Sequence, residues 1–268
     1  CRNRGAVIEN KVKKDGQVRK VGDTMIYDTG DTHANQRKWM EQIEVVLQKG
    51  DTIIVNGDFG VGFWGSCSRS EEVFYDYLAA RDYTVLFIDG NHENFEKLSD
   101  FPVEIWHGGR VHKIRNNVIH LMRGEVCEIE GHTIFAMGGG YSLDKDYRTP
   151  GVSWWPQEMP SQEEYDNAAA NLERVGKRVD FIITHTAPSE TVYYLSTLRS
   201  LRIKNDVSEE LPLNMFLDEI RHKVTYRHWY FGHFHADAEL WRNQTAVFSS
   251  IRELVSGRIV RRWEPYEG

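Results

Sequence analysis

Aspartate, asparagine and histidine residues follow five separate apolar runs of this 268-residue sequence. Apolar runs of this kind predict buried strands. The carboxyl ends of strands in an open α/β sheet meet at one crevice, so these distant residues are expected to become neighbours. Carboxylates, imidazoles and an amide oxygen suit a divalent ion such as manganese, iron, zinc or nickel, and the lack of cysteine among them disfavours a thiolate site. The residues are Asp31 and His33, Asp58, Asn91 and His92, His185, and His233 and His235.

A glycine stands directly before the polar residues at four of these run ends, namely Gly30, Gly57, Gly90 and Gly232. Glycine lets the chain turn sharply out of a sheet and leaves backbone space beside an ion. The repeated pattern therefore favours one shared metal site over a set of ordinary turns.

The elements that must position these side chains alternate in type over the first part of the chain. Strands are predicted at 25–29, 52–56 and 83–88, and helices at about 35–48 and 70–81 lie between them. Both helical segments repeat apolar residues at the spacing of one helix face. The alternation is typical of an α/β fold.

After residue 100 the pattern changes. Four short strands, at 111–114, 117–122, 125–129 and 132–137, predict a meander or hairpins. An irregular segment with three prolines follows at about 138–160, and a loop of this length is usually functional or disordered, with its aromatic residues favouring function. The remaining predictions are helices at 161–175, 189–199 and 208–221, and strands at 179–184, 228–232, 245–250 and 254–263.

Composition and charge limit the class of protein. Apolar residues make up 40% of the chain, which is enough for a substantial core, and residues 25–268 are predicted to form a single domain after an N-terminal arm or leader at 1–24. The net charge of −7 argues against an extensive nucleic-acid surface and leaves room for a small phosphorylated substrate. Neither a membrane span nor a signal-type apolar run is present, so a cytoplasmic location is expected.

The three cysteines, Cys1, Cys67 and Cys127, are scattered along the chain. Their number and spacing argue against a disulfide framework and against a zinc knuckle. The oligomeric state is left open.

The ordered motifs resemble those of the calcineurin-like metallophosphoesterases over roughly residues 25–250. This resemblance implies a four-layer αββα sandwich, in which two mostly mixed β-sheets are flanked by helices. The motifs are Asp31-Thr32-His33, Gly57-Asp58, Gly90-Asn91-His92-Glu93, His185 with Pro188, and Gly232-His233-Phe234-His235.

The resemblance further implies two divalent transition-metal ions, with Mn²⁺ as the leading candidate, bridged by the Asp58 carboxylate. Two cations about 3.5–4 Å apart clamp the attacking and leaving oxygens of a displacement, and they ionise a bridging water to the hydroxide that attacks phosphorus. The other implied ligands are Asp31, His33 and His235 for the first ion, and Asn91, His185 and His233 for the second.

His92 is implied to face the phosphate, where an imidazole can stabilise the transition state or protonate the leaving alkoxide. The alternative is a histidine that only orients a carboxylate. Glu93 is expected to fix the turn. Candidates for substrate contact in the 138–160 segment are Tyr141, Lys145, Arg148 and Trp154.

One departure from the family bears on the substrate. Protein serine/threonine phosphatases of the family carry arginines beside the second and third motifs, where this chain has Phe59 through Phe63 and Asp89. Because bidentate arginine is the usual grip on a phosphomonoester dianion, a phosphodiester of nucleotide or other small-molecule type is favoured. The alternatives are a phosphomonoesterase or nucleotide pyrophosphatase with the same centre, and a non-catalytic scaffold, which the full set of expected ligands disfavours.

Overall fold

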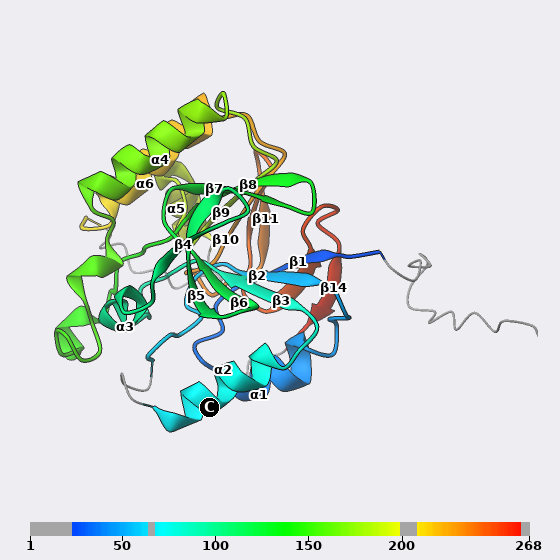
Figure 1. Cartoon of the computed structure of the whole chain (residues 1–268). Helices are drawn as coiled ribbons and strands as arrows, with labels where there is room; N and C mark the ends of the chain where they lie inside the picture. The colour runs from blue at the N-terminus through cyan, green and yellow to red at the C-terminus, as the bar shows by residue number, and fades with distance from the viewer. Residues whose placement is uncertain (1–22, 64–67, 199–207, 264–268) are drawn as a thin grey trace, which may run out of the picture.

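Two β-sheets pack against each other at the centre of the structure, and helices cover the outer face of each sheet (Figure 1). The structure is a computed structural model that describes residues 23–63, 68–198 and 208–263. This αββα sandwich confirms the predicted fold. Nearly all of the predicted arm at 1–24 lies outside the described residues. Among the described helices, none is long and apolar enough to cross a membrane.

The first sheet has eight strands in the order β14-β13-β1-β2-β3-β6-β5-β4. Its four central strands are mutually parallel, and antiparallel strands extend it on both sides. The central strands are β1 (Ile26–Thr29), β2 (Thr52–Val55), β3 (Thr84–Phe87) and β6 (Val118–Leu121). The flanking strands are β4 (Val103–Trp106), β5 (Gly109–Arg115), β13 (Ser250–Glu253) and β14 (Ile259–Arg262).

The second sheet has six strands in the order β11-β12-β10-β9-β8-β7. Strands β8 (His132–Met137), β9 (Phe181–Thr184), β10 (His228–Phe231) and β12 (Gln244–Ala246) run parallel. The edge strands, β7 (Glu125–Ile129) and β11 (Ala238–Leu240), are antiparallel to their neighbours.

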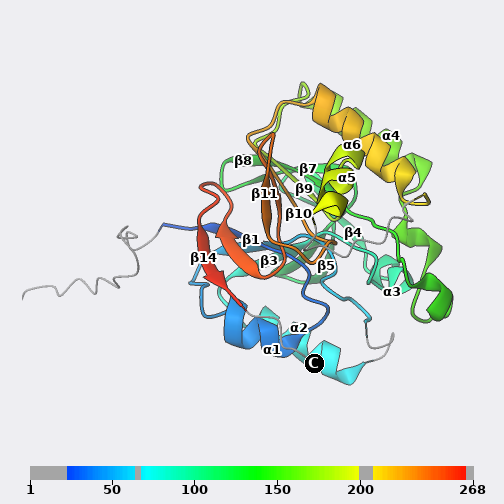
Figure 2. The same cartoon turned by 180° about the vertical axis from the view of Figure 1, so that it is seen from behind.

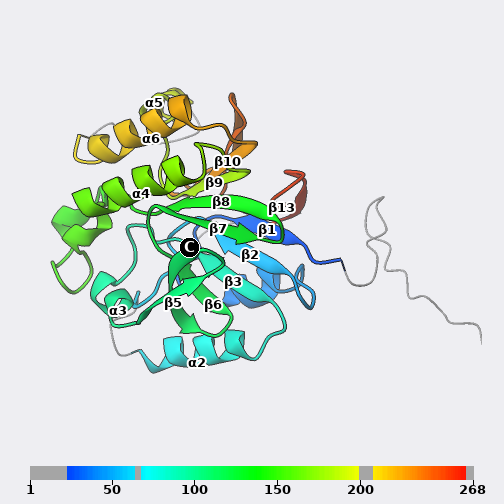
Figure 3. The same cartoon turned by 45° about the horizontal axis from the view of Figure 1, so that its top comes forward.

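Apolar side chains fill three layers, because alternate residues of a strand point to opposite faces of the sheet. In β2, Ile53 and Val55 pack under the helices while Ile54 packs between the two sheets. Helices α1 (Gln36–Lys38) and α2 (Arg69–Ala79) cover the first sheet (Figure 2). Helices α4 (Gln162–Arg174), α5 (Ser189–Thr197) and α6 (Leu211–Lys223) cover the second (Figure 3).

The helix predicted at 35–48 is wrong in extent and type. After α1 the chain forms a π-helical turn over Trp39–Ile43, in which the Glu44 N–H donates to the Trp39 carbonyl at 2.9 Å. Both Trp39 and Ile43 are fully buried in the layer between the helices and the first sheet.

The strands predicted near the C-terminus are also wrong in extent. The strand predicted at 245–250 ends early because the backbone N–H groups of Phe248, Ser249 and Ser250 donate to the Asp237 carboxylate at 2.9–3.2 Å. In place of one strand at 254–263, a turn before Gly257, whose φ is 70°, separates β13 from β14.

The irregular segment at 138–160 contains two 3₁₀ turns, Lys145–Tyr147 and Pro156–Glu158. It lies beside the short helix α3 (Phe95–Ser99), in green at the left of Figure 1. The buried Glu158 carboxylate accepts the Ser142 N–H at 3.0 Å, which ties the two ends of the segment together. The segment is therefore ordered by its own polar contacts.

Candidate metal centre

Five strands from the two sheets deliver polar residues to one place. Strands β1, β2 and β3 of the first sheet and β9 and β10 of the second are each followed by predicted ligands. The structure brings all seven of these side chains together. They are Asp31, His33, Asp58, Asn91, His185, His233 and His235.

The first donor set combines two carboxylates and two imidazoles. His33 Nε2 lies 3.1 Å from Asp58 Oδ2, and His235 Nε2 lies 3.2 Å from Asp31 Oδ2. Ligand atoms of Asp31, His33 and His235 all lie within 4.8 Å of one another. These four residues are the ones that the resemblance implied for the first ion.

The second donor set is tighter. Asn91 Oδ1 lies 3.1 Å from both His185 Nε2 and His233 Nδ1, and the two imidazole nitrogens are 3.2 Å apart. Asp58 reaches this set as well, because its Oδ1 lies 3.5 Å from His185 Nε2. Asp58 is thus positioned between the two sets, as a bridging carboxylate requires.

The outer contacts of the second set fix which atoms face inward. His185 Nδ1 donates to the Asn56 carbonyl at 2.8 Å, and His233 Nε2 lies 3.2 Å from the Glu210 carboxylate. When both rings are neutral, protons on those outer nitrogens leave a lone pair on each inner nitrogen. Two imidazole lone pairs and an amide oxygen therefore converge, and a cation between them removes their mutual repulsion. The donor set fits a divalent ion.

Asn91 is oriented by the 138–160 segment. Its Nδ2 donates to the Ser142 hydroxyl at 3.0 Å, which turns the amide oxygen toward His185 and His233. Ser142 follows the end of β8 and the glycines 138–140, a signal that could have pointed to it. Glu210 follows no strand end and no glycine, so it carries no sequence signal that predicts its role here.

Four of the seven expected ligands have left-handed backbone conformations. The φ angles of His33, Asp58, His233 and His235 lie between 48° and 65°. Non-glycine residues persist there only when surrounding contacts hold them, and such residues cluster at functional sites. One such contact joins the His33 N–H to the Asp58 carbonyl at 2.7 Å, and another joins the His233 N–H to Asp31 Oδ1 at 3.1 Å.

Two of the predicted glycines are required by close approach. A Cβ atom on Gly57, whose φ is 90°, would lie 2.1 Å from His185 Nδ1. On Gly90 it would lie 2.1 Å from Asp58 Oδ1. Any side chain at either position would collide with an expected ligand.

The electrostatics of the centre favour anionic carboxylates. Burial opposes charge on Asp58, but the neighbouring His185 and His92 hold its pKa well below the usual value. Burial likewise opposes charge on Glu210, yet contact with His233 lowers the pKa of Glu210 to about 2. On His233, burial is outweighed by the Glu210 carboxylate, which raises the pKa of the imidazole to about 9. A metal ion held by this residue would take the place of the proton on its inner nitrogen.

His92 lies at the edge of the first donor set. Its backbone N–H donates to Asp58 Oδ1 at 2.9 Å, and its ring meets the His33 ring edge-on at 5.2 Å. Arg148 Nη2 lies 3.1 Å from His92 Nε2, so the guanidinium donates to a neutral imidazole. Burial, together with the charges of Arg148 and His33, lowers the pKa of His92 to about 4 despite the opposing charge of Asp58.

Arg148 is the loop candidate that the structure brings to this centre. Its Nε also pairs with Asp144 at 2.8 Å. Lys145 instead pairs with Glu209 at 2.5 Å, and its ammonium lies 4.6 Å from the Tyr141 ring centroid. It also lies 5.8 Å from the Trp154 ring centroid, so Tyr141, Lys145 and Trp154 form one cluster of side chains.

Asp89 forms a buried ion pair with Arg123. Arg123 Nη2 lies 2.6 Å from Asp89 Oδ2, and His120 Nε2 lies 3.0 Å from Asp89 Oδ1. Arg123 also donates to the carbonyls of Gln157 and Glu158, at 2.8 and 3.2 Å. The residue that stands in place of a family arginine therefore anchors the 138–160 segment.

Glu93 lies in the turn after Asn91 and His92. Its two carboxylate oxygens accept the backbone N–H groups of Gly60 and Gly90, at 3.1 and 2.9 Å. The side chain thereby joins the turns that follow β2 and β3, in agreement with its predicted role.

Comparison with known proteins gives one family match. Residues 26–237 match the family model of the calcineurin-like phosphoesterases, which is well over half of the chain. No curated protein matches the chain. Among solved structures, the sulfate thiohydrolase SoxB of Thermus thermophilus, in complex with glycerol, is 13% identical with a TM-score of 0.37. That match covers 85% of this chain and 40% of the SoxB chain.

Proposed function

The chain belongs to the calcineurin-like phosphoesterase family, and from this premise we propose that it is a metal-dependent phosphoesterase that hydrolyses small phosphodiesters. The observation that carries the proposal is the pair of donor sets that share Asp58. One set combines carboxylates and imidazoles, and the other combines imidazoles and an amide oxygen.

The expected ligands would hold two divalent ions. Once bound, such ions supply Lewis acidity toward a phosphoryl oxygen and lower the pKa of a water molecule. The mixture of oxygen and imidazole donors supports manganese as the leading candidate, with iron, zinc and nickel as alternatives. His233 and His185 would face the ions with their inner nitrogens, because Glu210 and the Asn56 carbonyl hold the outer protons.

Arg148 and His92 would bind the reacting phosphate. A guanidinium donates to phosphoryl oxygens with charge-assisted hydrogen bonds, and Arg148 already lies within 3.1 Å of His92. His92 Nε2 holds no proton while it accepts a hydrogen bond from Arg148. We therefore assign this imidazole the role of orienting the Arg148 guanidinium before any proton transfer. Arg148 supplies one cation, where a phosphatase specific for phosphomonoester dianions has a pair of arginines. One cation suits a phosphodiester, because a diester carries a single negative charge at the reacting phosphorus.

Two chromogenic esters test the proposal. The protein loaded with Mn²⁺ is expected to hydrolyse bis(4-nitrophenyl) phosphate with a higher kcat/KM than 4-nitrophenyl phosphate. The change Asp58→Asn is expected to lower kcat by about 100-fold or more, because it removes the bridging carboxylate. The rates are followed by the absorbance of nitrophenolate, and metal content is measured in each sample.

Asp82→Asn is the matched control, since Asp82 is exposed and pairs only at the surface with Lys49. Its activity is expected to equal that of the unaltered protein. A higher kcat/KM for the monoester would instead support the phosphomonoesterase alternative. A protein that binds no divalent ion would support the scaffold.

A further inference from the structure

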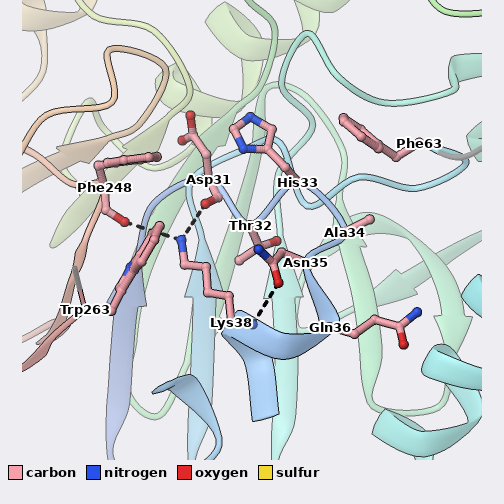
Figure 4. A pocket seen from close by; sticks show the side chains of 10 residues that line it. All are labelled: Asp31, Thr32, His33, Ala34, Asn35, Gln36, Lys38, Phe63, Phe248 and Trp263. Atoms are coloured by element: carbon pink, nitrogen blue, oxygen red, sulfur yellow. Dashed lines mark hydrogen bonds between the residues drawn. The ribbon is translucent and has the colours of Figure 1, made fainter. Parts of the chain in front are cut away.

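A cavity of about 530 Å³ lies beside the first donor set (Figure 4). Asp31 and His33 form part of its lining and are also expected ligands. Its volume lies in the usual range for small-molecule sites, about 300–1,000 Å³. A group esterified to a phosphorus atom held at the first ion would have this cavity as its neighbour.

Aromatic rings line the cavity on two sides. In Figure 4, Phe248 and Trp263 stand on one side of Asp31 and His33, and Phe63 stands on the other. The Phe248 and Trp263 centroids are 5.4 Å apart. Phe248 also stacks on the expected ligand His235, with centroids at 4.5 Å and an interplanar angle of 18°. The aromatic wall is thus continuous with the first donor set.

The cation in the cavity wall is already bonded within the protein. The buried Lys38 ammonium donates to the Asp31 carbonyl at 2.6 Å and lies 4.1 Å from the Trp263 ring centroid. It also reaches the Phe248 carbonyl at 3.5 Å. Lys38 therefore positions the wall and leaves no free charge for a ligand.

Other polar groups of the lining are engaged in the same way. The Thr32 hydroxyl donates to the Phe59 carbonyl at 3.2 Å, and Gln36 Nε2 donates to the Ser70 carbonyl at 3.1 Å. Asn35 Oδ1 accepts the Lys38 N–H at 2.9 Å. With these groups bonded inside the protein, the aromatic part of the lining consists of Phe63, Phe248 and Trp263.

We propose that this cavity binds a planar aromatic ring carried by one ester group of the substrate, such as an aryl group or a nucleobase. The proposal rests on the proposed function, because the phosphorus must lie at the donor sets. Stacking between rings adds to the free energy gained by burying apolar area, and it tolerates different rings. The cavity therefore determines specificity for the group on phosphorus, while the donor sets bind the phosphate itself.

Binding of two phosphonates tests the cavity independently of turnover. Phenylphosphonate is expected to bind the Mn²⁺-loaded protein about tenfold more tightly than methylphosphonate, measured by isothermal titration calorimetry. Trp263→Leu and Phe63→Leu are each expected to reduce this ratio to about threefold or less, with little change for methylphosphonate. Tyr193→Leu is the matched control, because Tyr193 is 73% exposed on α5.

Two variants are used because Trp263→Leu removes a ring beside the buried Lys38 ammonium and could disturb the fold. Phe63 is not one of the residues that surround this ammonium, so Phe63→Leu tests the cavity without that change. Unchanged thermal unfolding and metal content confirm that each variant is intact. A phenyl preference that persists in both intact variants, or is missing from the unaltered protein, overturns the proposal even if diesters are hydrolysed. If no ester is hydrolysed but the variants lose the phenyl preference, the cavity assignment stands and the proposed function fails.

Discussion

At the scale of single residues, Arg148 joins the irregular 138–160 segment to the strand end that carries His92. Arg148→Met is expected to lower kcat/KM for bis(4-nitrophenyl) phosphate by about 10- to 100-fold, because a charge-assisted hydrogen bond to the phosphate is lost. Metal content should not change. Lys145→Met is the control from the same segment, since Lys145 pairs with Glu209. Equal losses in the two variants would contradict the assignment of Arg148.

Glu210 acts on the centre through His233. Glu210→Gln removes the charge that holds the outer proton of that imidazole, so we expect a 10- to 100-fold weaker affinity for the second ion. Calorimetric titration of the metal-free protein with Mn²⁺ measures this affinity. The neighbouring Glu209→Gln is a close control, because Glu209 lies at the surface and bonds Lys145. Unchanged stoichiometry and affinity in Glu210→Gln would contradict the prediction.

Residues of the metal centre could be predicted from the sequence only where they follow the end of a predicted strand. All seven expected ligands follow β1, β2, β3, β9 or β10, so chain order and strand direction were enough to place them together. Ser142 and Glu210 reach the centre from the 138–160 segment and from the start of α6. Ser142 stands behind the end of β8, as the ligands stand behind their strands, but the place of Glu210 depends on how distant segments pack, which no local pattern encodes.

At the scale of elements, the Asp89–Arg123 pair connects the end of β3 with the chain between β6 and β7 and with the 138–160 segment. Both side chains are buried, so Arg123→Met leaves the Asp89 carboxylate buried without its arginine, and with His120 as its remaining side-chain contact among those described above. We expect a loss of about 3–5 kcal/mol in the free energy of unfolding, measured with urea.

Arg37→Met is the matched control for that experiment. Arg37 pairs with Glu41 at 2.9 Å, and both of these side chains are exposed. A loss of about 0–1 kcal/mol is expected there. In the double variant Asp89→Asn with Arg123→Met, part of the stability should return, because the unpaired charge is gone. A loss in Arg123→Met no larger than the control loss would contradict the prediction.

Buried strands could be predicted from the sequence more readily than exposed edge strands, because burial on both faces requires a continuous apolar run. The parallel strands β2 and β9 are buried along their whole length and read as continuous apolar runs. The edge strand β4 exposes Val103 and Ile105, and β11 has only three residues, so neither has a clear period and neither was predicted. Helix α3 was also missed, because its five residues are too few to show a helical period.

At the scale of the whole molecule, a buried histidine in the first sheet and a half-buried one in the second make stability depend on pH. Burial lowers the pKa of His112 in β5 and of His228 in β10 to about 4, from an ordinary value of 6.5. The folded protein thus binds fewer protons than the unfolded chain between these values. Their contribution is present above pH 6.5 and is lost as the pH falls toward 4.

Urea unfolding of the metal-free protein at several pH values between 4 and 7.5 measures this dependence. In His228→Gln the slope below pH 6.5 is expected to be smaller, because the side chain no longer titrates while an amide replaces the contact with the Thr245 hydroxyl. The exposed His107→Gln supplies the control slope, which should match the unaltered protein. Equal slopes in all three proteins would rule out this source of acid sensitivity.

The distribution of the expected ligands over both sheets has a consequence for the order of events during synthesis. Asp31 leaves the ribosome before β2 is made, whereas His235, its partner in the first donor set, follows only after β10. A growing chain cannot assemble either donor set until β10 and the residues directly after it have been made. Uptake of ions would then come late in synthesis, and a truncated product that ends before β10 would bind none at these sets.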